Sequence, residues 1–382
     1  MGLRSRRQFR FESGTHAFAC NLDLIAGTAV GQVSHDDTFR NYLNRIDPEY
    51  LAEIPGRIVD RLIRMKLLDH WRLKGAFLIA LDATGQLRFH RRHCPYCITQ
   101  ALSNGTTLYY HPVLEAKLVT SSGLAFSVAS EFIDNRDGGE EQDCERKAFG
   151  RLAVKLKGRF PRLPVIILGD ALYACAPFFD TCRRNGWRFI VTFKEGSLPA
   201  LFEEYQALRD AQGSNRVQRL ASADIRQRFA WVNGLDHQGH RVNAFECTET
   251  VRGKNKQTYH AWLTDLPVTE ESVAQLSNQG GRQRWKIENQ GFDVQKHHGY
   301  ELEHAYSRKP VAAENFYYLL QVAHAINQLM IKGALRKVFA HVMGSLRNYY
   351  RRLAESLRNE AINPNTVEAW ATKRIQIRLD TS

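Results

Sequence analysis

The chain has 382 residues, which is enough for two or three domains or for one domain with a large insertion. Hydrophobic residues make up 43% of it, which excludes wholesale disorder, and no apolar run reaches the roughly 18–20 residues that a membrane-spanning helix needs. Lysine and arginine outnumber aspartate and glutamate by 53 to 40, and the formal charge of +13 favours a polyanionic partner such as nucleic acid.

The cysteines and the N-terminal segment bear on where the protein works. Seven cysteines are an odd number, and most of them are scattered, which argues against a secreted disulfide framework. The basic N-terminus, MGLRSRRQFR, is not followed by an apolar segment of signal-peptide length. We therefore expect a soluble cytoplasmic protein, which associates with the nucleoid when it is bound to DNA.

The first part of the chain is predicted to be helical, and the pattern then changes to that of strands. In RIVDRLIRMKLLDHW (57–71), apolar residues recur at helical spacing, which supports a helical N-terminal region over residues 1–74. GAFLIALD (75–82) is a continuous apolar run that ends in an acid, as expected of a buried central strand. Two more strands are predicted at 108–119 and 124–132, joined by the turn TSSG.

Helices and strands alternate in the middle of the chain. Residues 140–160 carry acids early and bases late, which suits the dipole of a helix, and VIILGD (165–170) is a second buried strand that ends in an acid. The further predicted elements are helix 174–185, strand 187–193, helix 198–211, a β-rich insertion at about 212–266, a helix within 269–298, helix 312–330, and a basic tail at 332–382 that is helical up to Asn363-Pro364.

Two of the predicted strands end in an aspartate, Asp82 and Asp170. Three strands, a helix, a strand, a helix and a strand form the order of a ribonuclease H-like α/β fold, in which the first and fourth strands are neighbours. The two acids would then meet at the carboxyl end of one sheet, where open α/β sheets usually build their sites. Because two carboxylates repel each other, a divalent cation is expected between them, and oxygen ligands favour Mg²⁺ or Mn²⁺.

A third acid, Glu288, lies in the predicted helix within 269–298 and would complete the set of ligands. Two metal ions about 3.5–4 Å apart can activate a water or a 3′-hydroxyl and can stabilise the leaving oxygen in phosphodiester exchange. Asp82 and Asp170 could instead cap the turns that follow them, and Glu288 could pair with Arg284 one helical turn away on a solvated surface. The strand-end acids Asp134, Asp137 and Asp265 are rivals for the same role.

Three segments resemble the motifs of the DDE transposases of bacterial insertion sequences, specifically of those with a β-rich insertion before the catalytic glutamate. The segments are LIALDATG (78–85), VIILGDALY (165–173) and RWKIENQGFDVQK (284–296), and the resemblance covers roughly residues 75–330. It implies an enzyme that performs DNA transposition, a form of DNA recombination, by endonuclease cleavage and strand transfer at the ends of an insertion sequence. It also implies that Asp82, Asp170 and Glu288 bind two Mg²⁺ or Mn²⁺ ions, and that the protein works as a homodimer on double-stranded DNA.

The chain departs from the family signature in two places. The signature places Tyr, Arg, Glu and Lys in one helix, with two, three and six residues between them, and Arg284 and the glutamate fit it. Gly281 stands at the tyrosine position and Gln295 at the lysine position, one residue before Lys296. We hypothesise that a one-residue bulge near Gly291 brings Lys296 into register. The resemblance then implies that Arg284 and Lys296 contact the DNA phosphate near the scissile bond.

Other basic residues are candidates for DNA contact. Lys286 lies in the predicted catalytic helix, and the hairpin-like tip RGKNK carries Arg252, Lys254 and Lys256, which could reach a phosphate backbone or could keep an exposed turn solvated. The helical N-terminal region and the basic tail are candidates for recognising the transposon ends.

A separate motif, FHRRHCPYC (89–97), is a candidate zinc site. Cys94 and Cys97, with His93 or His90 just before them and His111 downstream, could hold a structural Zn²⁺ ion in a tetrahedral site. The alternative is a loop of reduced thiols.

The sequence thus predicts a ribonuclease H-like DDE catalytic domain at 75–331 with a β-rich insertion, flanked by a helical N-terminal region and a basic helical C-terminal tail. Its predicted function is that of a transposase. Two alternatives stay open: a metal-dependent nuclease of the same fold without strand transfer, and a non-catalytic DNA-binding protein derived from a transposase.

Overall fold

The computed structural model describes residues 6–136, 138–139, 141–253, 257–304, 306–333, 339–373 and 377–379. Asp137, Lys254 and Lys256, all named above as candidates, lie outside these ranges.

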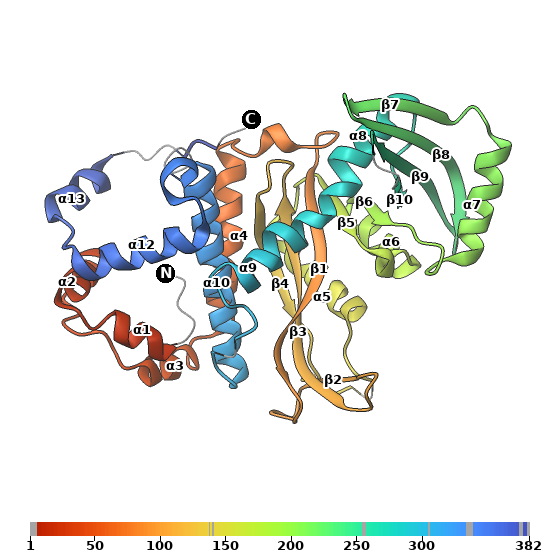
Figure 1. The fold of residues 1–382 in the computed structure, drawn as a ribbon. Coiled ribbons are helices and arrows are strands. Elements are labelled where there is room, and N and C mark those ends of the chain that lie inside the picture. The colour runs from red at the N-terminus through yellow and green to blue at the C-terminus, as the bar shows by residue number, and fades with distance from the viewer. Residues whose placement is uncertain are drawn as a thin grey trace.

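The described chain is a mixed α/β protein in which helices pack around one long sheet (Figure 1). The strands are β1 (Phe77–Phe89), β2 (Ile98–Ala101), β3 (Thr107–Val119), β4 (Ala125–Phe132), β5 (Val165–Gly169), β6 (Arg188–Thr192), β7 (Arg216–Ser222), β8 (Ile225–His237), β9 (His240–Val251) and β10 (Gln257–Thr264). The α-helices are α1 (Arg6–Glu12), α2 (His16–Ala26), α3 (Asp36–Leu43), α4 (Pro48–Arg64), α5 (Glu145–Arg159), α6 (Ala176–Asn185), α7 (Pro199–Ala211), α8 (Glu270–Gln275), α9 (Asp293–His297), α10 (Pro310–Lys332), α12 (Leu346–Asn359) and α13 (Pro364–Thr372).

The sheet has the order β2-β3-β1-β5-β6-β10-β9-β8-β7, and β4 pairs with β3. The pairs β1–β5 and β5–β6 are parallel, whereas the other pairs are antiparallel. The first and fourth predicted strands are β1 and β5, so the prediction that they are neighbours is confirmed. The predicted β-rich insertion forms strands β7 to β10, which continue the same sheet because β10 pairs with β6.

Side chains alternate along β1, so its two faces have different neighbours. Ile79 and Leu81 pack with apolar residues of α4, α5 and α6, whereas Leu78 and Ala80 pack with Ile287 and other residues of the segment after the insertion. Both sets are buried, as expected for a strand between two layers of helices. The second of these faces is the one that bears the candidate site.

The prediction that Asp82 ends the first strand is wrong, because β1 continues to Phe89. Pairing with β5 stops at Ala80 and Leu168, but pairing with β3 continues through Asp82 opposite Glu115 and on to Phe89. The second half of β1 therefore forms an arm with β3 and β2 that extends beyond β5 (Figure 1).

The predicted helix at 57–71 also differs from the structure, in which α4 spans Pro48–Arg64. Asp47 caps its N-terminus by accepting a hydrogen bond from the Glu49 N–H, and Pro48 follows at the first helical position, where it is favoured. Lys66 has a φ of 58°, a left-handed conformation that ends the helix before the apolar pattern does. The helices predicted within 140–160, 174–185, 198–211 and 312–330 are confirmed, with small shifts at their ends.

Helices from the two ends of the described chain pack against each other (Figure 1). The Asn21 side-chain amide donates to the backbone oxygens of Leu357 and Glu360 at 3.0 and 2.8 Å, and Arg358 pairs with Glu12 at 2.5 Å. Among the described helices, none has both the length and the apolarity that crossing a bilayer requires.

Candidate functional site

Asp82 and Asp170 lie next to each other in the order of the sheet, on the face described above. The last parallel pair between β1 and β5 joins Ala80 to Leu168, so each aspartate lies two residues beyond it. Alternation along the strands directs both side chains to the face that carries Leu78 and Ala80. The Asp170 carboxylate accepts a hydrogen bond from the Leu172 N–H at 2.8 Å, so the alternative reading of Asp170 as an N-cap is also observed.

Glu288 lies in a broken helix that crosses this face, rather than in the one continuous helix predicted within 269–298. The segment runs from α8 through a π-helical turn at Leu276–Gly280, a 3₁₀ turn at Gly281–Arg284 and a π-helical turn at Ile287–Phe292 into α9. Glycines allow its close approach to the sheet, because a Cβ atom on Gly281 would lie 2.3 Å from Trp262 Nε1. The indole of Trp262 therefore occupies the space that a tyrosine at position 281 would need, which explains the first departure from the family signature.

The second departure concerns Gln295 and Lys296. The hypothesised bulge is present as the π-helical turn at Ile287–Phe292, which includes Gly291. Gln295 is fully buried, so the position of the signature's lysine faces the protein interior. The Lys296 Nζ atom lies 3.2 Å from a Glu303 carboxylate oxygen, and within the described residues no ion pair joins Lys296 to Glu288.

A buried polar network lies beneath this broken helix and connects it to β3. Lys117 is fully buried, lies 3.1 Å from Glu115 and donates a hydrogen bond of 2.6 Å to Gln321 on α10. Gln295 donates to the same Gln321 oxygen at 2.8 Å. A Cβ atom on Gly291 would lie 3.1 Å from the Lys117 side chain, so the helix rests directly on the lysine stem.

Arg284 links two of the three acids. Its Nη1 atom lies 2.8 Å from Glu288 Oε1 and 4.0 Å from Asp82 Oδ2. Its guanidinium carbon lies 4.7 Å from the centre of the Trp285 ring. The arginine side chain is only 10% exposed, so this is not the solvated surface pair of the alternative reading. Two acids from distant parts of the sequence thus share one partly buried cation.

The ionisation of Asp82 reflects this crowding of negative charge. Burial, followed by the charge of Glu288, raises the pKa of Asp82 to about 7, although Arg284 acts in the opposite direction. A carboxyl group that takes up a proton near neutral pH lacks a full counter-charge, which is a feature shared by many functional sites.

A fourth acid, Glu145, belongs to the site and was not singled out from the sequence. It is the first residue of α5, and Tyr173 Oη donates a hydrogen bond of 2.7 Å to its carboxylate. Burial and then the charge of Asp170 raise the pKa of Glu145, and the charge of Glu145 in turn raises the pKa of Asp82. Acids at a helix start were read as partners of the helix dipole, so only their place in the fold reveals this role.

The acids form a looser group than a ready metal site. Within the described residues, Asp82, Asp170 and Glu288 are not among the groups of three or more candidate ligands whose ligand atoms all lie within 4.8 Å of one another. Arg284 lies between two of these carboxylates, and the third accepts the Leu172 N–H. The donor set itself, carboxylate oxygens without sulfur or imidazole, has the chemistry that suits Mg²⁺ or Mn²⁺.

The candidate zinc ligands do come together as the sequence predicts. The ligand atoms of His93, Cys94, Cys97 and His111 lie within 4.8 Å of one another in the described structure, and this cluster could hold a metal ion. His90, the alternative histidine, is not part of the group.

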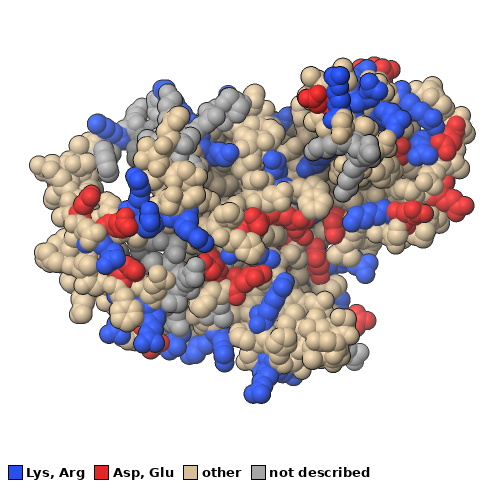
Figure 2. Space-filling model, in the orientation of Figure 1, with Lys and Arg blue, Asp and Glu red and all other residues tan. Residues whose placement is uncertain are grey.

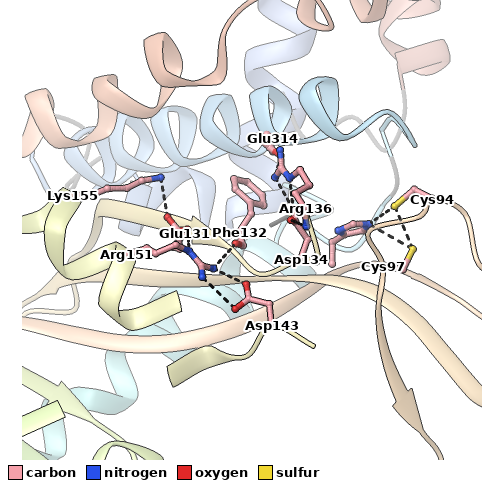
Figure 3. A network of polar contacts seen from close by, with 11 residues as sticks. Cys94, Cys97, Glu131, Phe132, Asp134, Arg136, Asp143, Arg151, Lys155 and Glu314 are labelled. Atoms are coloured by element: carbon pink, nitrogen blue, oxygen red, sulfur yellow. Dashed lines mark hydrogen bonds and ion pairs between the residues drawn. The ribbon is translucent and has the colours of Figure 1, made fainter. Parts of the chain in front are cut away.

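The rival acids within the described chain have other partners. Asp134 accepts a hydrogen bond of 2.7 Å from Arg136, which also pairs with Glu314, and Figure 3 shows these contacts beside Cys94 and Cys97. Asp265 pairs with Arg188 at 3.1 Å and accepts the Phe189 N–H. Both acids thus have structural roles away from Arg284.

The remaining candidate DNA contacts lie at the surface to different degrees. Lys286 is half-buried, and Arg252 is exposed, with its backbone N–H donating a hydrogen bond to the Asp224 carbonyl.

Comparisons of the chain with protein-family profiles and with curated proteins find no match. The resemblance drawn from the motifs therefore stays a prediction.

Proposed function

We propose that this protein is a DDE-type DNA transposase, which cleaves DNA at the ends of an insertion sequence and joins the freed ends to target DNA. The observation that carries the proposal is the shared contact of Arg284 with Asp82 and Glu288 on β1 and the broken helix, while Asp170 directly follows the neighbouring strand β5. This arrangement supports the proposal that the three acids of the sequence motif act together.

The strand order supports a ribonuclease H-like core for this site. In such a core the first and fourth strands are neighbours, and here β1 and β5 are parallel neighbours with β3 and β4 on one side and β6 on the other. Strand β2 extends the arm beside β3, and β7 to β10 belong to the β-rich insertion that precedes Glu288 in the chain.

Asp82, Asp170 and Glu288 are the residues that would hold two Mg²⁺ or Mn²⁺ ions. Such ions, when bound, make a water or a 3′-hydroxyl a better nucleophile and stabilise the leaving oxygen. The pKa of Asp82 is raised to about 7, and a bound cation would lower it again by stabilising the ionised carboxylate.

Arg284, Glu145 and Tyr173 have supporting roles in this proposal. Arg284 offsets part of the charge of Asp82 and Glu288 in the described conformation, and the donors of its guanidinium are equally suited to a DNA phosphate. Tyr173 orients Glu145 through its hydrogen bond, and this keeps one further acceptor oxygen beside Asp170.

The surface is compatible with a phosphate backbone that crosses the site. Figure 2 shows acidic side chains gathered across the middle of one face, over the broken helix, and many basic side chains at the upper right over β7 and β8. Basic flanks attract the DNA, whereas the acidic strip requires cations for the DNA to approach. In this proposed function, the protein acts as a homodimer that binds two transposon ends.

The test uses the full chain, Mg²⁺ and two DNA substrates: intact DNA that carries the sequences flanking the coding region, and pre-cleaved ends of the same sequence. We expect Glu288→Gln to lower cleavage and strand transfer on the order of 10³-fold or more, because metal ions supply several kcal/mol of transition-state stabilisation. DNA binding should be largely retained.

Asp293→Asn is a control, because Asp293 is an exposed acid of the same segment that lies 3.4 Å from His298. It should cleave at nearly the unaltered rate. Undiminished cleavage by Glu288→Gln would refute the site, and cleavage without joining of pre-cleaved ends would identify a nuclease instead.

A further inference from the structure

The arm formed by β1, β2 and β3 carries four candidate metal ligands whose spacing can be compared with that of a real site. Cys94 Sγ lies 3.5 Å from Cys97 Sγ and 3.1 Å from His111 Nε2. Cys97 Sγ lies 3.7 Å from His111 Nε2 and 3.4 Å from His93 Nδ1. Zn–S bonds of about 2.3 Å and Zn–N bonds of about 2.0–2.1 Å in a tetrahedron require S–S separations of about 3.8 Å and S–N separations of about 3.5 Å.

We propose that His93, Cys94, Cys97 and His111 bind one structural Zn²⁺ ion. The proposal is independent of the proposed function, because these residues lie on the arm and not among the acids at Arg284. Four protein ligands complete a tetrahedron, and Cys97 and His111 are buried, so the ion would have no open position for a substrate.

Two simpler readings account less well for this geometry. A disulfide between Cys94 and Cys97 would need a sulfur–sulfur distance of about 2.05 Å, whereas both thiols are free and 3.5 Å apart. Ordinary thiol–imidazole contacts occur elsewhere, for example between Cys20 and His16 at 3.5 Å, but that pair does not belong to any group of three or more candidate ligands in the described chain.

The ion would fasten the loop between β1 and β2 to strand β3 within the arm. His111 is a residue of β3 and lies opposite Gln86 of β1, whereas the other three ligands belong to the loop between β1 and β2. Asn135, which follows β4, donates its side-chain amide to the Cys97 carbonyl at 3.2 Å and its backbone N–H to the Tyr96 carbonyl. The site thus joins the loop to β3 at a point where the loop also contacts the segment after β4.

The first test measures the metal content of the full chain after purification without chelators. We expect about one zinc per chain, and at least a tenfold lower content in Cys97→Ser and in His111→Ala. Cys20→Ser is the matched control, because it removes a thiol that also contacts a histidine, and its zinc content should be unchanged. An unaltered chain that contains no zinc and takes up none when Zn²⁺ is added would overturn the proposal.

A second measurement does not depend on variants that could fail to fold. Replacement of the bound metal with Co²⁺ should give the intense visible absorption of tetrahedral cobalt and a sulfur-to-metal charge-transfer band, as expected for two thiolate ligands. Zinc removal should also speed tryptic cleavage after the exposed Arg91 and Arg92 in the loop severalfold. An octahedral cobalt spectrum, or cleavage that is the same with and without zinc, would contradict the assignment.

Discussion

The acidic site and the His/Cys cluster both bring together candidate metal ligands from separate segments. The ligand atoms of the cluster contact one another, whereas two of the acids contact an arginine. In the cluster, sulfur and ring nitrogen atoms lie within 4.8 Å of one another and contact each other directly. In the acidic site, Arg284 lies 2.8 Å from Glu288 and 4.0 Å from Asp82. Neutral thiols and imidazoles can lie close together without a metal ion. Ionised carboxylates repel one another, so they need a nearby positive charge, which Arg284 supplies here.

The largest effect is expected when that cation, Arg284, is removed. Arg284→Ala should lower the cleavage rate on the order of 10²-fold, because a preorganised positive charge is lost from the reacting phosphate. The Mg²⁺ concentration that gives half of the maximal rate should fall, because the arginine no longer competes for Asp82 and Glu288. A titration of rate against Mg²⁺ concentration measures both changes.

Arg282→Ala is the control for this prediction, because Arg282 pairs with Glu249 at 2.8 Å, two residues before Arg284. It should leave the Mg²⁺ requirement unchanged. If Arg284→Ala raises the Mg²⁺ requirement, the guanidinium helps to hold the metal site together instead of substituting for the ions.

The ionisation of Asp82 gives a second effect, which acts on stability and not on the reaction rate. Its pKa rises from 3.8 to about 7 on folding, so the folded state retains a proton that the unfolded chain releases, and stability falls as pH increases from about 4 to 7. In the absence of Mg²⁺, Asp82→Asn should therefore be more stable than the unaltered protein by about 4 kcal/mol at pH 8 and no more stable below pH 4. Urea unfolding across this pH range measures the difference, and a gain that is the same at pH 4 and pH 8 would contradict the assignment.

The smallest expected effect concerns the fourth acid. Tyr173→Phe removes the hydrogen bond to Glu145, which should cost about 1 kcal/mol of unfolding free energy and slow cleavage a few-fold. Tyr306→Phe is the comparison variant, because its hydroxyl donates to the Tyr300 carbonyl away from the site. Equal losses of activity in both variants would show that Tyr173 acts through stability alone.

The sequence was sufficient to predict most strands and helices, because continuous apolar runs and helical spacing report burial directly. The end of β1 was missed, because Ala83, Thr84 and Gly85 lack a strong apolar pattern and are held as a strand only by pairing with β3. The breaks in the helix were missed because two glycines alone do not indicate where a helix changes its geometry. Gly280 and Gly281 are explained only by the side chains of Ile190 and Trp262, which lie against them in the fold.

The two candidate sites were predicted with different completeness, because one is formed mainly by sequence neighbours and the other by distant segments. The His/Cys cluster was found because three of its ligands lie close together in the sequence, which leaves only His111 to be guessed. Glu145 was not found, since a single acid at a helix start is common, and the contact of Arg284 with both Asp82 and Glu288 depends on how distant segments pack. Local patterns predict chemistry only where the ligands are neighbours in the chain.

The contacts between α2 and α12 have a consequence for how the protein is made. Asn21 and Leu357 are separated by 336 residues, which the ribosome needs roughly 20–70 s to synthesise at 5–20 residues per second. Until then α2 lacks its partner helix, so this region matures only after the sheet and its acids have emerged. The hydrogen bonds of Asn21 to α12 therefore form only after the whole sheet has been synthesised.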